Sequence, residues 1–204
     1  MEILINIEII LFIILFILTK QIGIYLLFIL FVLIHEISHM LTGVIFGFVP
    51  QKFLIMPFGF KIQFKEIKTS KRVEQKKILV AASGPIVNIL VIFVAIVFNL
   101  NITIIYINLA IALFNLLPIY PLDGGRILRS ILNIRLEYVR SYKIVNKVSN
   151  VCIVLITAVC SILVLYVKNI SIVFALMYLW FVVIKENKKY KMIKRVYDVI
   201  ETKK

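Results

Sequence analysis

Charged side chains are scarce in this chain, and acidic ones are scarcer still. Only 17% of the 204 residues are charged, and Lys and Arg outnumber Asp and Glu by 24 to 10. A soluble domain usually has about a quarter of its residues charged. The deficit excludes an ordinary water-soluble domain, because the surface of such a domain needs far more polar side chains than this sequence supplies.

Cysteine and histidine are almost absent as well. The two cysteines, Cys152 and Cys160, lie in one apolar run, so the sequence predicts neither a disulfide framework nor a cysteine-type metal site. The only two histidines are His35 and His39. Any role that needs an imidazole is therefore confined to this pair.

Apolar residues take the place of the missing polar ones. They make up 62% of the chain, and the mean hydropathy is +1.05. Long uncharged runs alternate with short charged clusters, which is typical of helices that face lipid, and about 20 residues cross about 30 Å of hydrocarbon. The sequence predicts an all-α polytopic membrane protein with six transmembrane helices. The predicted spans are residues 3–19, 22–46, 78–99, 101–117, 149–167 and 170–184.

The net charge of +14 is explained by membrane topology. The cations flank the apolar runs, and no nucleic-acid-binding fold is available to carry them, so no nucleic-acid partner is predicted. The segments after spans two, four and six together hold 22 of the 24 Lys and Arg residues. Because short basic loops stay on the cytoplasmic side, both termini are predicted to be cytoplasmic.

Two segments outside the spans have patterns of their own. Residues 52–56 and 60–67 alternate in polarity around Met56-Pro57-Phe58-Gly59, which predicts a small β-hairpin between spans two and three. Residues 185–204 are basic with spaced apolar positions, which favours an amphipathic helix on anionic lipid over a solvated end. The expected division is a transmembrane domain over residues 1–184 and a basic cytoplasmic tail over 185–204.

Span two contains the sequence His35-Glu36-Ile37-Ser38-His39. Residues four apart share one face of a helix, so both imidazoles can bind one metal ion. Glu36 lies beside them and can hold and deprotonate a metal-bound water. An ionised carboxylate in an apolar span costs about 2.5–3.5 kcal/mol, so its presence there indicates function. Counted from Gly47 at about 1.5 Å per residue, the pair lies roughly 12–18 Å deep.

A catalytic zinc site needs a third protein ligand, and Asp123 is the predicted one. Asp123 follows Pro118 and Pro121 and precedes Gly124-Gly125. Such a stretch favours non-helical backbone, which membrane proteins tolerate where it lines a cavity. The alternative role for Asp123 is a turn cap before the glycines. Most other acids lie in basic loops or tails, and Glu8 in span one is interpreted as a polar contact near the interface.

Together the two motifs resemble those of the site-2 protease family of intramembrane zinc metalloproteases. The resemblance rests on His-Glu-x-x-His at residues 35–39 and on Leu-Asp-Gly at residues 122–124. The fuller run from Asn115 to Arg126, with Gly84-Pro85-x-x-Asn88 at the opening of span three, is most similar to stage IV sporulation protein FB. The resemblance covers about residues 1–185.

The resemblance implies roles for single residues. It implies a zinc site with an acid/base beside it, in which the ligands are His35, His39 and Asp123 and the acid/base is Glu36. It also implies that three further residues position the substrate. These are Asn88, Asn115 and Pro121. A helix N-terminus with proline in its first turn explains Gly84-Pro85 equally well.

The implied function is zinc-dependent hydrolysis of a membrane-associated protein on the cytoplasmic side of a bacterial membrane, with the lipid bilayer and membrane-protein inhibitors or regulators as further partners. The resemblance favours a sporulation pro-sigma-factor precursor as substrate, with an anti-sigma factor or a signal-peptide remnant as the alternative. Two other classes stay open. One is a metallopeptidase with Glu as third ligand, although no Glu lies in a later span. The other is a zinc-binding transporter or scaffold, although no repeated architecture is visible.

Overall fold

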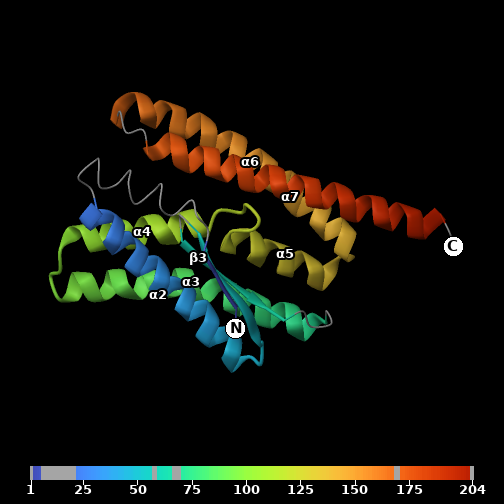
Figure 1. Cartoon of the computed structure of the whole chain (residues 1–204), viewed down its shortest axis with the longest axis horizontal. Coiled ribbons are helices and arrows are strands. Elements are labelled where there is room, and N and C mark those ends of the chain that lie inside the picture. Colours follow the sequence, from blue (N-terminus) through green and yellow to red (C-terminus); the bar gives the residue numbers. More distant parts are fainter. Residues whose placement is uncertain (1, 6–21, 57–58, 66–69, 168–170, 203–204) are drawn as a thin grey trace. The chain divides into compact units, whose positions relative to one another are not determined.

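The computed structural model describes residues 2–5, 22–56, 59–65, 70–167 and 171–202. Its backbone divides into two compact units, Met1–Asn115 and Leu116–Lys204. The first unit contains β1 (Glu2–Ile5), α2 (Ile22–Ile45), β2 (Pro50–Met56), β3 (Gly59–Phe64), α3 (Lys71–Val97) and α4 (Ile102–Asn115). The second unit contains α5 (Asp123–Arg135), α6 (Tyr138–Val167) and α7 (Ser171–Thr202) (Figure 1).

Three helices in the described part of the chain are long and apolar enough to cross a membrane, by length and composition: α2, α3 and Tyr138–Ile162 of α6. Helix α4 has 14 residues. At 1.5 Å per residue it is about 21 Å long, short of the ~30 Å of hydrocarbon. The predicted span 3–19 is wrong at its start, because Glu2–Ile5 is a strand, and residues 6–19 lie outside the described residues. The count of six crossings stays a prediction.

The three strands form one sheet in the order β1-β2-β3. Strand β1 runs parallel to β2, and β2 runs antiparallel to β3 with Met56 opposite Gly59. The β2–β3 pair lies between α2 and α3, where the sequence predicts the hairpin, and its position relative to a membrane stays a prediction. Strand β3 approaches α2 closely at Gly43, where an added Cβ would lie 2.4 Å from the ring of Phe64.

The helices of the first unit pack as a group of three, in which α2 contacts both α3 and α4 and α3 contacts α4. Phe31 and Val32 of α2 and Ile107 and Ile111 of α4 form a buried apolar cluster. Many other large apolar side chains of these helices stay exposed, for example Phe93 with 65% of its surface accessible. An apolar outer face of this kind suits contact with lipid.

Helix α3 begins earlier than the predicted span 78–99. It starts at Lys71, where the Oγ of Ser70 accepts a hydrogen bond from the backbone N–H of Val73 at 3.3 Å. Gly84-Pro85 therefore lies inside the helix, and the expectation that it opens a helix is wrong. Pro85 has no N–H to donate to Ala81, but one missing bond is tolerated in a helix of 27 residues.

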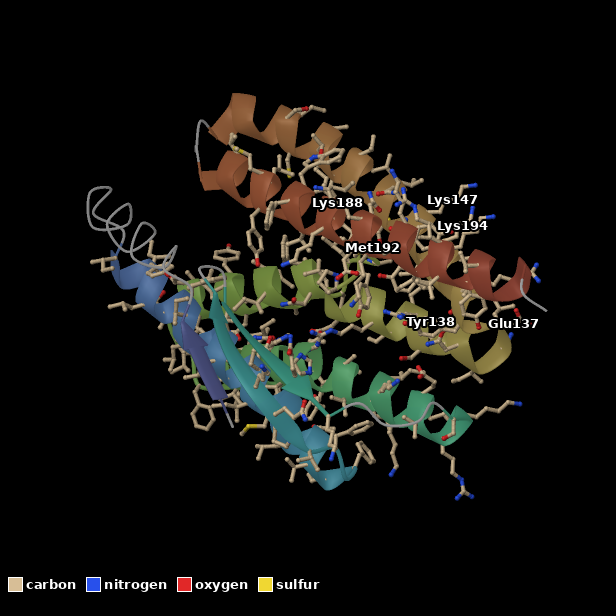
Figure 2. All side chains as sticks on the ribbon, turned by 45° about the vertical axis from the view of Figure 1, so that its right-hand side comes forward. Glu137, Tyr138, Lys147, Lys188, Met192 and Lys194 are labelled. Carbon is tan, nitrogen blue, oxygen red and sulfur yellow. The ribbon has the colours of Figure 1, made fainter. Side chains whose placement is uncertain are left out.

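In the second unit, α6 and α7 lie side by side and α5 packs against α6 (Figure 1). A buried apolar cluster joins Ile119 and Ile153 to Leu179 and Val183. Helix α5 lies in a segment for which the sequence predicts only a loop. Helix α7 continues without a break from the predicted span 170–184 into the basic tail. Figure 2 shows the exposed cations Lys147, Lys188 and Lys194 on α6 and α7; contact of the tail with lipid stays a prediction.

Candidate metal centre

The two histidines of α2 lie together in the interior of the first unit. His35 has 1% and His39 has 2% of its surface exposed. Their rings are nearly perpendicular, and the two Nε2 atoms are 3.1 Å apart. The four-residue spacing on one helix accounts for this proximity, because such residues lie one above the other.

The opposite nitrogen of each ring faces an acceptor supplied by α3. His35 Nδ1 lies 2.5 Å from Asn88 Oδ1, and His39 Nδ1 lies 2.6 Å from the carbonyl oxygen of Val80. A carbonyl oxygen only accepts hydrogen bonds, so each Nδ1 carries the proton. In a neutral imidazole with its proton on Nδ1, Nε2 is the nitrogen that can bind a metal ion.

Gly84 of α3 lies directly against the two Nε2 atoms. A Cβ added at this glycine would lie 2.5 Å from His39 Nε2 and 2.6 Å from His35 Nε2. Any other residue here would push a methyl group against the atoms that would bind a metal ion. The close approach of α3 to α2 at this point thus depends on the absence of a side chain.

The pair fits a zinc ion. Zinc–imidazole bonds are about 2.0–2.1 Å long, so two nitrogens on one tetrahedral ion are about 3.4 Å apart. The observed 3.1 Å between the Nε2 atoms is close to that separation.

Asp123 is the first residue of α5 in the second unit, and it is 4% exposed. A carboxylate is favoured at a helix N-terminus by the partial positive charge of the unpaired backbone N–H groups. Arg126, one turn later, places its Nη1 3.5 Å from Asp123 Oδ1. Asp123 thus opens a helix, and the turn that the sequence predicts lies before it.

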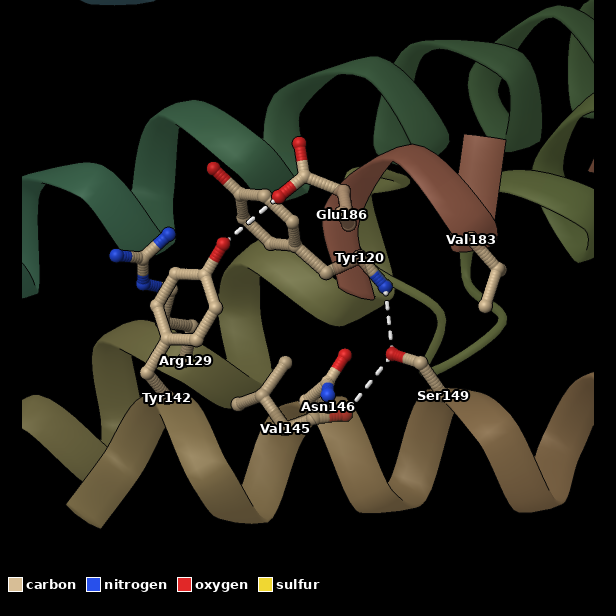
Figure 3. A pocket seen from close by; sticks show the side chains of 8 residues that line it. All are labelled: Tyr120, Arg129, Tyr142, Val145, Asn146, Ser149, Val183 and Glu186. Atoms are coloured by element: carbon tan, nitrogen blue, oxygen red, sulfur yellow. Dashed lines mark hydrogen bonds between the residues drawn. The ribbon is translucent and has the colours of Figure 1, made fainter. Parts of the chain in front are cut away.

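That preceding turn is tightly folded, because two glycines allow backbone to approach backbone. A Cβ at Gly124 would lie 2.1 Å from the carbonyl oxygen of Leu116, and one at Gly125 would lie 2.4 Å from the backbone nitrogen of Tyr120. The Tyr120–Pro121 peptide bond is cis. The turn is also tied to α6, since the N–H of Tyr120 donates to Ser149 Oγ at 3.0 Å (Figure 3).

Among the described residues, His35, His39 and Asp123 are each buried, and all three are residue types that bind metal ions. Two imidazoles and one carboxylate are a ligand set that zinc accepts, and three protein ligands leave a fourth position for water or substrate. The chemistry of the donors therefore agrees with a catalytic metal site.

The other predicted site residues have mixed placements. Glu36 follows His35 on α2 and is half-buried. Asn115 is the last residue of α4 and donates from Nδ2 to the carbonyl of Ile111 at 3.1 Å. Asn88, predicted to position substrate, is fully buried and bonded to His35. Its role toward the substrate stays a prediction. Sequence reasoning missed the acceptor carbonyl of Val80, for which a single sequence holds no signal.

The chain is similar to known proteins in sequence and in fold. Residues 97–159 match the model of Peptidase family M50. A zinc metalloprotease of Methanocaldococcus jannaschii is 30% identical over 118 residues, which cover 52% of this chain and 33% of that protein, so this chain spans about a third of the relative's length. The solved site-2 protease of the same organism matches with a TM-score of 0.69 at 24% identity, over 90% of this chain and 89% of that one. The chain therefore has the fold of that site-2 protease and carries a Peptidase family M50 match in residues 97–159.

Proposed function

We propose that this protein is an intramembrane zinc metalloprotease that hydrolyses a membrane-associated protein. The observation that carries the proposal is the pair of buried Nε2 atoms of His35 and His39, which lie 3.1 Å apart with Gly84 directly against them. The match to Peptidase family M50 and the zinc metalloprotease relative support the reaction class. The three apolar helices support a location in the membrane.

In this proposal His35, His39 and Asp123 hold the zinc ion, which when bound lowers the pKa of water and polarises the scissile carbonyl. Glu36 is the acid/base, because it follows His35 on α2 and is half-buried. It takes the proton from the attacking water and returns it to the leaving amine. Glu36 alone can carry out both proton transfers.

The test is cleavage of a membrane-tethered substrate by the purified protein in lipid vesicles, with and without a zinc chelator. We expect cleavage that stops with the chelator and returns when zinc is added back. Zinc binding at one ion per chain without any cleavage of a panel of tethered substrates would favour the alternative, a zinc-binding membrane protein without hydrolysis.

The substrate that we propose is a sporulation pro-sigma-factor precursor. The support is the resemblance of the run from Asn115 to Arg126 to stage IV sporulation protein FB. An anti-sigma factor or a signal-peptide remnant is the alternative. Side-by-side cleavage of the three substrate types decides between them, and a preference for either alternative would remove the sporulation role.

We further propose that Asn115 and Pro121 face the substrate and that both termini are cytoplasmic. Asn115 ends α4 eight residues before Asp123, and its half-buried amide could bond an extended substrate backbone. An Asn115→Ala variant should turn over substrate more slowly with unchanged zinc content, and wild-type turnover would remove the role.

The proposal for the termini rests on the charge asymmetry, and labelling of added terminal cysteines from either side of vesicles tests it.

A further inference from the structure

Two asparagines are completely buried between the apolar helices of the first unit. Asn88 on α3 and Asn108 on α4 both have 0% of their surface exposed. Burying an amide costs free energy unless its donors and acceptors are paired, and the cost is greater where no water can replace the missing partner. Asn108 is the polar member of the otherwise apolar sequence Ile107-Asn108-Leu109-Ala110-Ile111, and the zinc site as described gives it no role.

Three hydrogen bonds join these amides into one chain that ends at a metal ligand. Asn108 Nδ2 donates to the carbonyl of Ile104, one turn earlier on α4, at 2.9 Å. Asn88 Nδ2 donates to Asn108 Oδ1 at 2.8 Å. His35 Nδ1 lies 2.5 Å from Asn88 Oδ1.

The direction of the chain is fixed at its far end. The carbonyl of Ile104 can only accept, so Asn108 must turn its NH₂ group toward it and its Oδ1 toward Asn88. Asn88 must then present its NH₂ group to Asn108 and its Oδ1 to His35. Rotating either amide by half a turn would set donor against donor or acceptor against acceptor.

We propose that Asn108 is a positioning residue for the metal site: through Asn88 it holds His35 in the tautomer that has its proton on Nδ1 and its lone pair on Nε2. The proposal rests on the proposed zinc site, because Nε2 is the atom that would face the ion. His39 does not depend on the amide chain, since its Nδ1 faces the backbone carbonyl of Val80 at 2.6 Å. The two ligands are therefore oriented by different means.

The first variant removes the far amide. Asn108→Leu keeps a side chain of similar size but leaves Asn88 free to rotate and present its NH₂ group to His35. His35 would then place its proton on Nε2, where a metal ion cannot bind. Loss of such an outer partner weakens metal binding about 10–100-fold, and we expect a rise of that size in the zinc dissociation constant measured by chelator competition.

The matched control is Asn150→Leu. Asn150 Oδ1 accepts from Asn187 Nδ2 at 2.9 Å, so this variant also breaks an amide–amide bond between two helices, but in the second unit, whereas both histidines belong to the first. We expect its zinc affinity to stay near that of the wild type. An equal loss of affinity in both variants would overturn the proposal, because it would show a general effect of breaking an amide–amide bond between helices.

The second readout is the tautomer itself, measured without metal. Because the chain has only two histidines, protein labelled with ¹⁵N-histidine and purified without a histidine tag gives imidazole signals from these two rings alone. At a pH at which imidazole is neutral, both rings should carry the proton on Nδ1. In Asn108→Leu, His35 should show protonated Nε2 while His39 stays unchanged. An unchanged His35 in this variant would overturn the proposal.

A rescue variant separates orientation from packing. A carboxylate offers only acceptors whichever way it turns, so with Asn88→Asp the proton on His35 Nδ1 no longer depends on Asn108. Adding Asn108→Leu to Asn88→Asp should weaken zinc binding far less than Asn108→Leu does alone, and an equal loss in both backgrounds would contradict the proposal. If the protein binds no zinc at all, the proposed function fails, while the tautomer measurement still decides the role of Asn108.

Discussion

The two units hold the side chains that we propose as metal ligands in different ways. In the first unit, the histidines are fixed by acceptors on α3, at 2.5 Å from Asn88 and 2.6 Å from Val80. In the second unit, Asp123 is fixed by backbone, because it opens α5 directly after the turn in which Gly124 and Gly125 pack against residues 116–120. The comparison teaches that changes near the histidines should act on metal affinity, whereas changes near Asp123 should act through the stability of a turn.

The largest effect is expected for Glu36→Gln, which separates chemistry from metal binding within the first unit. A general acid/base contributes about 10²–10⁴-fold to the rate, so the cleavage rate should fall by a factor of about 10² or more. Zinc content should stay at the wild-type value, because Gln keeps the shape and Glu36 is not one of the proposed ligands. Cleavage kinetics and metal analysis of the same purified sample check both parts, and loss of zinc would contradict the assigned role.

The second prediction sets one unit against the other. His35→Ala and Asp123→Ala should each reduce bound zinc well below one ion per chain, because a zinc site with two protein ligands is weak. Metal analysis of detergent-purified protein gives the result. Full zinc content in Asp123→Ala, together with loss in His35→Ala, would show that the second unit supplies no ligand and would leave Asp123 with the turn-cap role.

The two close-packed glycines sharpen the comparison. Gly84→Ala puts a methyl group 2.5–2.6 Å from both Nε2 atoms, so its main effect should be a loss of zinc affinity. Gly124→Ala puts one 2.1 Å from the carbonyl oxygen of Leu116, so stability should fall by about 1–3 kcal/mol, as in other overpacked sites. Zinc competition and thermal unfolding are measured on both variants. The reverse pattern would break the comparison.

The smallest effect is expected for Ser149→Ala. This change removes the acceptor of the half-buried Tyr120 N–H, and the loss of one such hydrogen bond costs about 0.5–1.5 kcal/mol. Thermal unfolding should show the loss. Ser161→Ala is the control, because that exposed hydroxyl bonds only to Ala158 in its own helix turn and should leave stability unchanged. Equal melting temperatures for the two variants would show that Ser149 does not hold the turn.

Much of the fold was predictable because apolar runs and turn residues are local signals. The runs that became α2 and α4 are close to their predicted spans, and the hairpin lies around residues 57–58 as the alternation indicates. The wrong predictions concern which strands pair and where a helix begins. The sequence places residues 3–5 in a span, but they belong to strand β1, since a short apolar strand and an apolar helix have the same pattern until the partner strand is known. The sequence also predicts a helix start at Gly84-Pro85, but α3 continues through these residues.

The sequence by itself determined which side chains could bind a metal ion, because the spacing of His35 and His39 on one helix is a local geometry. It also identified Asp123 as the remaining carboxylate in a suitable setting. Only the tertiary structure decided which nitrogen of each imidazole faces the site. The reason is that the acceptors for the other nitrogens come from α3, 53 and 41 residues along the chain, and no local pattern records that contact.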